Sequence, residues 1–223
     1  DAAPGASENL QEEVLNLIPG PDLIVACPHC GALARQQTLL SGNTVGAVYW
    51  TDGKCEAPML PDLPAVTRCR SCGGFYWLAE ARVEGTLEPH SGSAPEAWRR
   101  APVVEHPTVP DYPDALSSGV ASDRERERYL RVRLWWAIND LIRHEAASEV
   151  PPAYREAAED NLRRLFDLLD DQEPEERVMK AEVARELADF QEAVRLLDRL
   201  PEEVRFAGEV VRALAQQGVS RVA

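Results

Sequence analysis

Four of the five cysteines form two identically spaced pairs. The pairs are Cys27-Pro28-His29-Cys30 and Cys69-Arg70-Ser71-Cys72, and a glycine follows each of them. Zn²⁺ prefers four thiolates in a tetrahedron, and a Cys-x-x-Cys turn brings two sulfurs to one ion. A tight turn of this kind favours a positive φ after its second cysteine, which glycine adopts without steric cost. The sequence therefore predicts one structural zinc ion held by Cys27, Cys30, Cys69 and Cys72.

The first pair also has the composition of a thiol–disulfide oxidoreductase motif. It follows the apolar run Leu23–Ala26 as it would follow a strand, and residues 31–40 can form the helix that such chemistry needs to lower the pKa of the first thiol. This alternative leaves Cys69 and Cys72 unexplained, whereas a zinc site uses both pairs. Zinc is the favoured interpretation, and a thiol–disulfide enzyme that uses the first pair is the alternative.

Four other residues near the pairs are not expected to bind metal. His29 lies between two ligands, where a side chain normally points away from the ion, and Cys55 is expected to be a half-buried strand residue. Arg68 and Arg70 are interpreted as offsetting thiolate charge. Residues 1–83 carry nine acidic and five basic side chains, so nucleic-acid binding through this region is disfavoured and stands as a second alternative.

Strands must hold the cysteines in place. The segment between the pairs, residues 31–68, exceeds the spacing of about 15–20 residues common in zinc ribbons, so it must contain extra structure. Val45–Thr51 is rich in strand-forming residues and is followed by the turn pair Asp52-Gly53, which predicts a hairpin. Asn43 and Asp52 are interpreted as turn formers. The strands that enter and leave the second pair are expected within Leu63–Arg68 and Phe75–Val83.

The composition changes beyond the second pair. From 85 to 121 prolines recur without a helical or strand period, which favours a connector that Trp98, Val103 and Val104 pin along a surface. A capping box then begins at Ser122, which is the expected N-cap of a long helix. Further helices are expected to begin at Pro152, Pro174, Phe190 and Pro201.

The helices are expected to pack into one domain. Trp135 and Trp136 point about 100° apart and are interpreted as filling two parts of its core. Ala188-Asp189-Phe190-Gln191-Glu192-Ala193 resembles the turn of a tetratricopeptide repeat, and Ala181 and Leu197 lie where that family places a small and a large residue. The resemblance covers residues 174–200 and implies a tetratricopeptide-like bundle.

The order of the parts also resembles a group of uncharacterised bacterial proteins in which a Cys-x-x-Cys ribbon precedes a helical tail. The resemblance rests on the stretches Ser41–Thr44, Trp50–Lys54 and Ala57–Pro61, and it implies no activity.

Together these patterns predict an α+β protein with four parts. Residues 1–20 are expected to be an N-terminal segment that can form a helix, 21–84 a small β-rich zinc-ribbon domain, 85–121 a Pro-rich connector, and 122–223 an all-α tetratricopeptide-like domain. No apolar run approaches the roughly 20 residues needed to cross a membrane.

The predicted function is non-catalytic. No Ser-His-Asp, nucleotide-loop or His-Glu-x-x-His pattern is present, and a four-cysteine zinc site has no open coordination position. Unpaired Cys-x-x-Cys turns suit a reducing compartment, so the cytoplasm is expected. The expected role is an adaptor that binds a protein partner, not identified by the sequence, through the helical domain. The formal net charge of −14 agrees with a partner other than nucleic acid.

Overall fold

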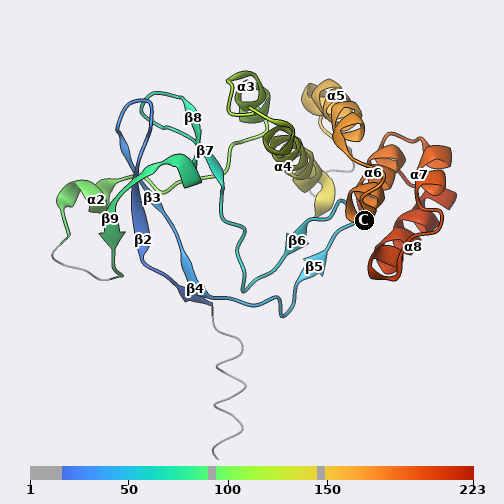
Figure 1. Cartoon of the computed structure of the whole chain (residues 1–223), viewed down its shortest axis with the longest axis horizontal. Helices are drawn as coiled ribbons and strands as arrows, with labels where there is room; N and C mark the ends of the chain where they lie inside the picture. Colours follow the sequence, from blue (N-terminus) through green and yellow to red (C-terminus); the bar gives the residue numbers. More distant parts are fainter. Residues whose placement is uncertain (1–16, 90–93, 145–148) are drawn as a thin grey trace, which may run out of the picture. The chain divides into compact units, whose positions relative to one another are not determined.

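The computed structural model describes residues 17–89, 94–144 and 149–223, which fall into two compact units. Residues up to Val48 and Cys55–Pro107 form the first unit, and Tyr49–Lys54 and Thr108–Ala223 form the second. Short strands dominate the first and helices the second, so the predicted α+β class is confirmed (Figure 1). Most of the expected N-terminal segment, residues 1–16, lies outside the described residues.

Two antiparallel hairpins form the centre of the first unit. Strands β2 (Asp22–Ala26) and β3 (Leu33–Gln36) make the first hairpin, and β7 (Val66–Arg68) and β8 (Phe75–Trp77) make the second. Strand β9 (Arg82–Leu87) pairs with the other edge of β2, which gives the order β3-β2-β9. Because β2 lies between two neighbours, its apolar run is continuous, and Ile24 and Val25 are fully buried.

The remaining short strands form two further pairs. They are β1 (Ile18–Pro19) paired with β4 (Leu39–Ser41), and β5 (Val48–Tyr49) paired with β6 (Cys55–Glu56). The helix that the redox alternative needs within residues 31–40 is therefore not formed. The strand expected over Phe75–Val83 is interrupted by the 3₁₀ turn η1 (Leu78–Glu80), after which the chain turns to pair with β2.

Residues 85–121, interpreted as a Pro-rich connector, contain regular structure. This stretch includes the end of β9, helix α2 (Glu96–Arg100) and helix α3 (Asp111–Ser117). The Trp98 ring packs on β9 so closely that a Cβ on Gly85 would lie 2.1 Å from it. Val104 is buried, and its N–H donates to the Arg35 carbonyl at 2.9 Å. These contacts supply order that the local proline pattern does not indicate.

Five further helices follow α3 in the second unit. They are α4 (Arg124–Arg143), α5 (Pro152–Leu168), α6 (Pro174–Glu186), α7 (Phe190–Leu196) and α8 (Glu202–Gln216). Prolines stand at or beside three of the four later helix starts, as predicted. The N-cap of α4 is Asp123 and not Ser122, since the Asp123 carboxylate accepts the Arg126 N–H at 2.9 Å. A carboxylate also interacts more favourably than a hydroxyl with the helix dipole.

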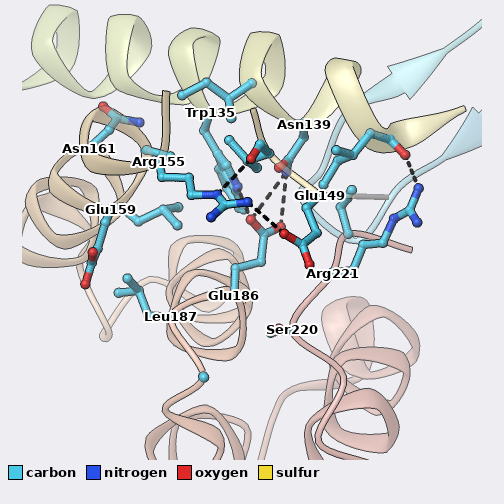
Figure 2. A pocket seen from close by; sticks show the side chains of 17 residues that line it. Trp135, Asn139, Glu149, Arg155, Glu159, Asn161, Glu186, Leu187, Ser220 and Arg221 are labelled. Atoms are coloured by element: carbon cyan, nitrogen blue, oxygen red, sulfur yellow. Dashed lines mark hydrogen bonds and ion pairs between the residues drawn. The ribbon is translucent and has the colours of Figure 1, made fainter. Parts of the chain in front are cut away.

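The core of the helical unit contains the first of the two tryptophans, as predicted. Trp135 is 2% exposed and packs with Leu165 and Val183, while Trp136 is half-buried. Helices α4, α5 and α6 also border a cavity with a volume of about 370 Å³ (Figure 2). Among the described residues, none of the helices has the length and apolar character required to span a membrane.

The tip of the β5–β6 hairpin belongs to the helical unit. Its loop has three residues and not the predicted two, because the Trp50 N–H donates to the Lys54 carbonyl and the Gly53 N–H donates to the Trp50 carbonyl, both at 2.9 Å. Gly53 takes a φ of +80°, as such a loop requires. The Thr51 N–H donates to the carbonyl of Ala223, at the end of the same unit.

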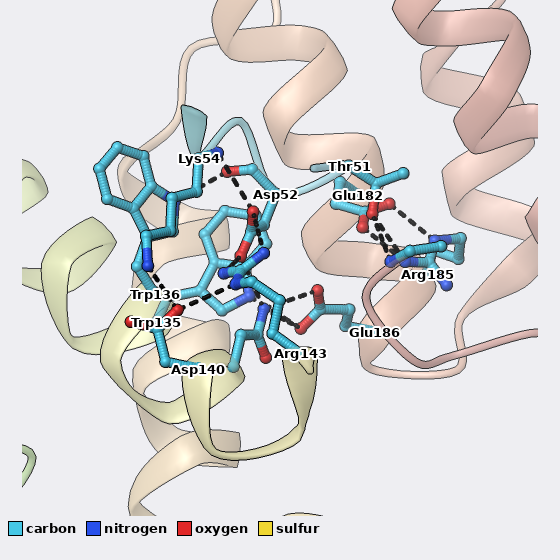
Figure 3. Close-up of polar contacts among 12 residues, drawn as sticks. Thr51, Asp52, Lys54, Trp135, Trp136, Asp140, Arg143, Glu182, Arg185 and Glu186 are labelled. Atoms are coloured by element: carbon cyan, nitrogen blue, oxygen red, sulfur yellow. Dashed lines mark hydrogen bonds and ion pairs between the residues drawn. The ribbon is translucent and has the colours of Figure 1, made fainter. Parts of the chain in front are cut away.

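Asp52 of this tip forms a buried ion pair with α4 (Figure 3). Its carboxylate accepts hydrogen bonds from the Arg143 guanidinium at 2.6 and 3.2 Å, and neither side chain is exposed. Asn139 donates to the same carboxylate at 2.9 Å, and the Trp136 indole N–H donates to the Asp52 carbonyl. Asp52 also accepts a hydrogen bond from the Lys54 N–H, as the predicted turn role requires. The same carboxylate therefore both forms the turn and pairs with α4.

Another buried ion pair lies in α6. Glu182 and Arg185 are fully buried, three residues apart, and the guanidinium donates to the glutamate from two nitrogens. Arg185 also donates to the carbonyls of Val219 and Arg221, which ties the end of the unit to this helix. The helical unit thus buries two ion pairs, Asp52–Arg143 and Glu182–Arg185.

The link between α6 and α7 is a Schellman motif that contains alanine where glycine is usual. The Asp189 N–H donates to the Ala184 carbonyl and the Ala188 N–H to the Arg185 carbonyl, both at 2.9 Å. Ala188 therefore takes a φ of +61°, which is unfavourable for a residue with a Cβ. Beyond this turn, Ala184, Ala193 and Ala215 form one buried cluster that lets α6, α7 and α8 approach closely.

We expect Asp52→Ala to destabilise the helical unit by about 3 kcal/mol, because it removes the fully buried carboxylate that pairs with the buried Arg143 guanidinium. Urea denaturation followed by helical circular dichroism measures this change. The matched control is Glu159→Ala, which breaks an exposed pair with Arg163 and should cost less than about 1 kcal/mol. Equal midpoints for the two variants would contradict the structural importance of Asp52.

We expect Ala188→Gly to stabilise the helical unit by about 0.5–1 kcal/mol, because glycine takes the positive φ without a Cβ clash. The control is Ala213→Gly in the exposed part of α8, where the same change should destabilise by about 1 kcal/mol. Urea denaturation followed by circular dichroism measures the free energy of unfolding of both variants. Shifts of the same sign would show that the strain at Ala188 is not significant.

Candidate metal centre

The four paired cysteines lie at the ends of the two hairpins of the first unit. Cys27 directly follows β2 and Cys30 precedes β3, while Cys69 directly follows β7 and Cys72 precedes β8. Each hairpin therefore presents one Cys-x-x-Cys turn at its tip. The register Ala26↔Leu33 in the first hairpin corresponds to Arg68↔Phe75 in the second.

The two turns share one backbone conformation. The Gly31 N–H donates to the Cys27 carbonyl and the Gly73 N–H to the Cys69 carbonyl, both at 2.8 Å. A second hydrogen bond closes each turn. The Cys27 N–H donates to the Ala32 carbonyl at 2.9 Å, and the Cys69 N–H donates to the Gly74 carbonyl at 2.8 Å. Gly31 and Gly73 take φ values of +73° and +76°. The prediction that glycine is needed after each pair is confirmed.

The four sulfurs converge on one point. All of them lie within 4.8 Å of one another, with 3.8 Å between the Sγ atoms of Cys27 and Cys72 and 3.7 Å between those of Cys30 and Cys69. Sulfurs bound to one zinc ion at about 2.3 Å lie about 3.8 Å apart at tetrahedral angles. The donor set and its spacing therefore fit a tetrahedral metal ion, and the four predicted ligands are brought together.

The site is buried on one side and open on the other. Cys27 and Cys69, the first residue of each pair, are 2% and 7% exposed and pack with Val25, Tyr76 and Leu78. Cys30 and Cys72 are exposed. One ligand from each pair thus anchors the centre to the core of the unit, and the other closes it towards solvent.

Electrostatics favour a cation between the thiols. Burial raises the pKa of the Cys27 thiol to about 12. Burial acts in the same direction on Cys69, but hydrogen bonds from the backbone N–H groups of Cys72 and Ser71 outweigh it and lower the pKa of Cys69 to about 7. Thiols this close cannot all ionise without a compensating positive charge. A divalent ion would supply that charge and bind the thiolates.

The residues around the cysteines explain the remaining local sequence. The His29 Nε2 atom lies 2.9 Å from the Phe75 carbonyl oxygen, so this side chain joins the two hairpins and is not a ligand, as predicted. A Cβ on Gly74 would come within 2.7 Å of the His29 ring, which explains the second glycine after Cys72. The double glycine is the sequence signal that the prediction did not use.

The two arginines near the second turn behave differently. The Arg68 Nε atom donates to the Gly73 carbonyl at 3.2 Å and the guanidinium lies over the Phe75 ring. Arg70 pairs with Glu105 at 2.7 Å, and its interpretation as offsetting thiolate charge stays a prediction. Cys55, in β6, is half-buried and lies outside the cluster, as predicted.

Comparisons with protein-family models, curated proteins and solved structures give no significant match to this chain. The resemblances to tetratricopeptide repeats and to ribbon-and-helix bacterial proteins thus gain no support from them. The functional interpretation depends on the geometry of the site itself.

Proposed function

We propose that this chain is a non-catalytic, cytoplasmic protein in which a zinc ribbon binds one structural zinc ion and the helical unit binds a protein partner. The observation that carries the zinc assignment is the tetrahedral spacing of the four sulfurs on two identical turns. Four thiolates complete the preferred coordination of zinc and leave no position for a substrate or a reactive water.

A structural role for the ion agrees with the size of its surroundings. The hairpins consist of strands of three to five residues, and the core around them is one small cluster. Strand pairs this short are marginal in water without additional stabilisation. Structural zinc contributes an apparent binding free energy of about 10–16 kcal/mol in small domains, which would dominate the folding of this unit.

The thiol–disulfide alternative is less well supported. A redox dithiol needs its first cysteine at a helix N-terminus, where the helix dipole lowers the thiol pKa. Cys27 is followed by a turn and strand β3, and burial raises its pKa. Nucleic-acid binding is also less well supported, because Arg70 near the site is paired with Glu105 and the chain carries a net charge of −14.

The adaptor role is supported by an apolar surface on the last helix. Phe206 is 80% exposed and Val210 37% exposed, and they stand four residues apart on the same side of α8. The opposite side of this helix is buried through Val211 and Ala215. In a tetratricopeptide-like arrangement of α6, α7 and α8, a partner protein would cover the exposed side.

We expect the purified protein to contain one zinc ion per chain by mass spectrometry. With metal bound, a thiol reagent should modify only Cys55, and after chelation all five cysteines should react, because the four ligands are released together. Cys69→Ser should abolish zinc binding, and the matched control Cys55→Ser should retain it. Full reactivity of Cys27 before chelation, with no metal and an isolable Cys27–Cys30 disulfide, would favour the redox alternative.

We expect a photo-crosslinking residue at position 206 to form a defined adduct with a partner protein in cells, because Phe206 is exposed and apolar. The control places the same residue at position 163, an exposed charged site on α5. Gel electrophoresis and mass spectrometry identify the adducts. Identical adduct patterns from the two positions, or none from either, would contradict a partner site on α8.

A further inference from the structure

The cavity of the helical unit combines apolar walls with charged side chains, among them the carboxylate of Glu186 (Figure 2). Its apolar lining comes from α4, α5, the C-terminal end of α6 and the end of the chain, through Ile138, Ile142, Leu162, Leu187 and Val222. The half-buried Glu186, the last residue of α6, also lines it. Its volume of about 370 Å³ is within the range of small-ligand sites.

Neutral donors hold the Glu186 carboxylate in place. The Trp135 indole N–H donates to Oε2 at 2.8 Å, and the Asn139 side-chain amide donates to Oε1 at 3.1 Å. Two donors from α4 therefore fix the orientation of the carboxylate, and neither brings a positive charge. Asn139 is further fixed by its bond to Asp52 at 2.9 Å.

The nearby cations of the described residues are engaged elsewhere. Arg143 pairs with Asp52 and Asp140, and Arg185 pairs with Glu182. No ion pair joins Glu186 to an arginine or lysine within the described part of the chain. By contrast with Asp52 and Glu182, Glu186 has hydrogen bonds from neutral donors, and Arg185 acts on it through its charge without an ion pair.

Two arginines that line the cavity are also held by other groups. Arg155 donates to Glu149 at 2.7 Å and to the Val150 carbonyl at 3.1 Å, and its side chain is more than half exposed. Arg221 donates to the Ile142 carbonyl. Neither arginine donates to Glu186, so a cation that enters the cavity can pair with its ionised carboxylate.

We propose that this cavity binds an organic cation that carries a primary ammonium group on a short apolar chain, with Glu186 as its counter-charge. The ammonium would occupy the free lone pairs of the carboxylate, and the apolar chain would replace water against the isoleucine and leucine walls. This binding is independent of the metal centre in the other unit and adds a second ligand to the protein.

The protonation of Glu186 gives the proposal a distinctive signature. Burial, and next the charge of Glu182, raise the pKa of Glu186 to about 8. The charge of Asp52 also raises this pKa, and the charge of Arg185 lowers it. The other charged residues that line the cavity are Glu149, Glu159, Arg155 and Arg221. At neutral pH the empty site is therefore largely protonated, and a bound ammonium displaces that proton. Affinity for the ammonium should rise with pH, by up to about tenfold per unit below the pKa of Glu186.

The test is isothermal titration calorimetry with n-pentylammonium and with pentan-1-ol, its neutral counterpart, on the full-length protein. Above the pKa of Glu186 and below that of the amine, we expect the ammonium to bind at least about tenfold tighter than the alcohol. Near neutral pH, its binding heat should depend on the ionisation enthalpy of the buffer, since a proton is released.

Glu186→Gln should remove both the preference for the ammonium and the proton release, while glutamine keeps one oxygen, which can accept one of the two hydrogen bonds. The matched control Glu159→Gln, an exposed carboxylate on the cavity rim, should retain both. The wild-type comparison of ammonium and alcohol needs no variant, so the test stands even if Glu186→Gln folds poorly. Equal affinities for the two compounds, no binding of either, or a preference that survives Glu186→Gln would overturn the proposal.

A second arm distinguishes a free amine from a lysine side chain. Nα-acetyl-lysine methylamide carries the same ammonium on a blocked peptide backbone. Weaker binding than n-pentylammonium would indicate a small amine ligand, and equal or tighter binding would indicate a lysine side chain. Both results support the same counter-charge role of Glu186.

Discussion

The first unit depends on bringing four sulfurs to one point. Two hairpins end in the same turn, and every local feature of those turns serves the convergence: the positive φ of Gly31 and Gly73, the paired backbone hydrogen bonds, and the histidine that joins one hairpin to the other. Without a cation, the four thiols would lie too close together for all of them to ionise. The four cysteines therefore form a cluster that could hold a metal ion, and the turns of this unit bring them together.

The segment between the two cysteine pairs is long because it also supplies part of the helical unit. Residues 49–54 belong to that unit, and Asp52 is the residue that fixes them there. A buried ion pair of this kind does not have to stabilise a fold relative to apolar side chains of similar size. It does specify one arrangement, because either charge alone would be left buried and unpaired. The inserted tip thus contributes specificity to the helical unit more clearly than it contributes stability.

The features that the sequence predicted are those with a local signal. Cys-x-x-Cys-Gly appears twice, and prolines mark helix starts, since each effect acts within a few residues. The residues that were missed depend on partners far along the chain. Asp52 resembles any turn aspartate until Arg143, 91 residues away, meets it. Trp98, by contrast, was expected to hold its segment against a surface, and it packs on Gly85. Ser122 and Asp123 are both good N-caps, and local sequence does not distinguish them.

Asp52 and Glu186 show how the same unit treats two carboxylates differently. One amide, that of Asn139, donates to both, at 2.9 and 3.1 Å. Asp52 also forms an ion pair with Arg143, and its side chain is closed off from solvent. The second donor to Glu186 is the neutral Trp135 indole N–H, and Glu186 lines a cavity. A glutamine at position 186 has one oxygen and could accept only one of the two donors, so the hydrogen bonds favour a carboxyl group at this position. They do not fix its charge, because either a proton or a positively charged ligand can neutralise the carboxylate. The proposed cation would replace that proton, so the raised pKa of Glu186 links what enters the cavity to pH.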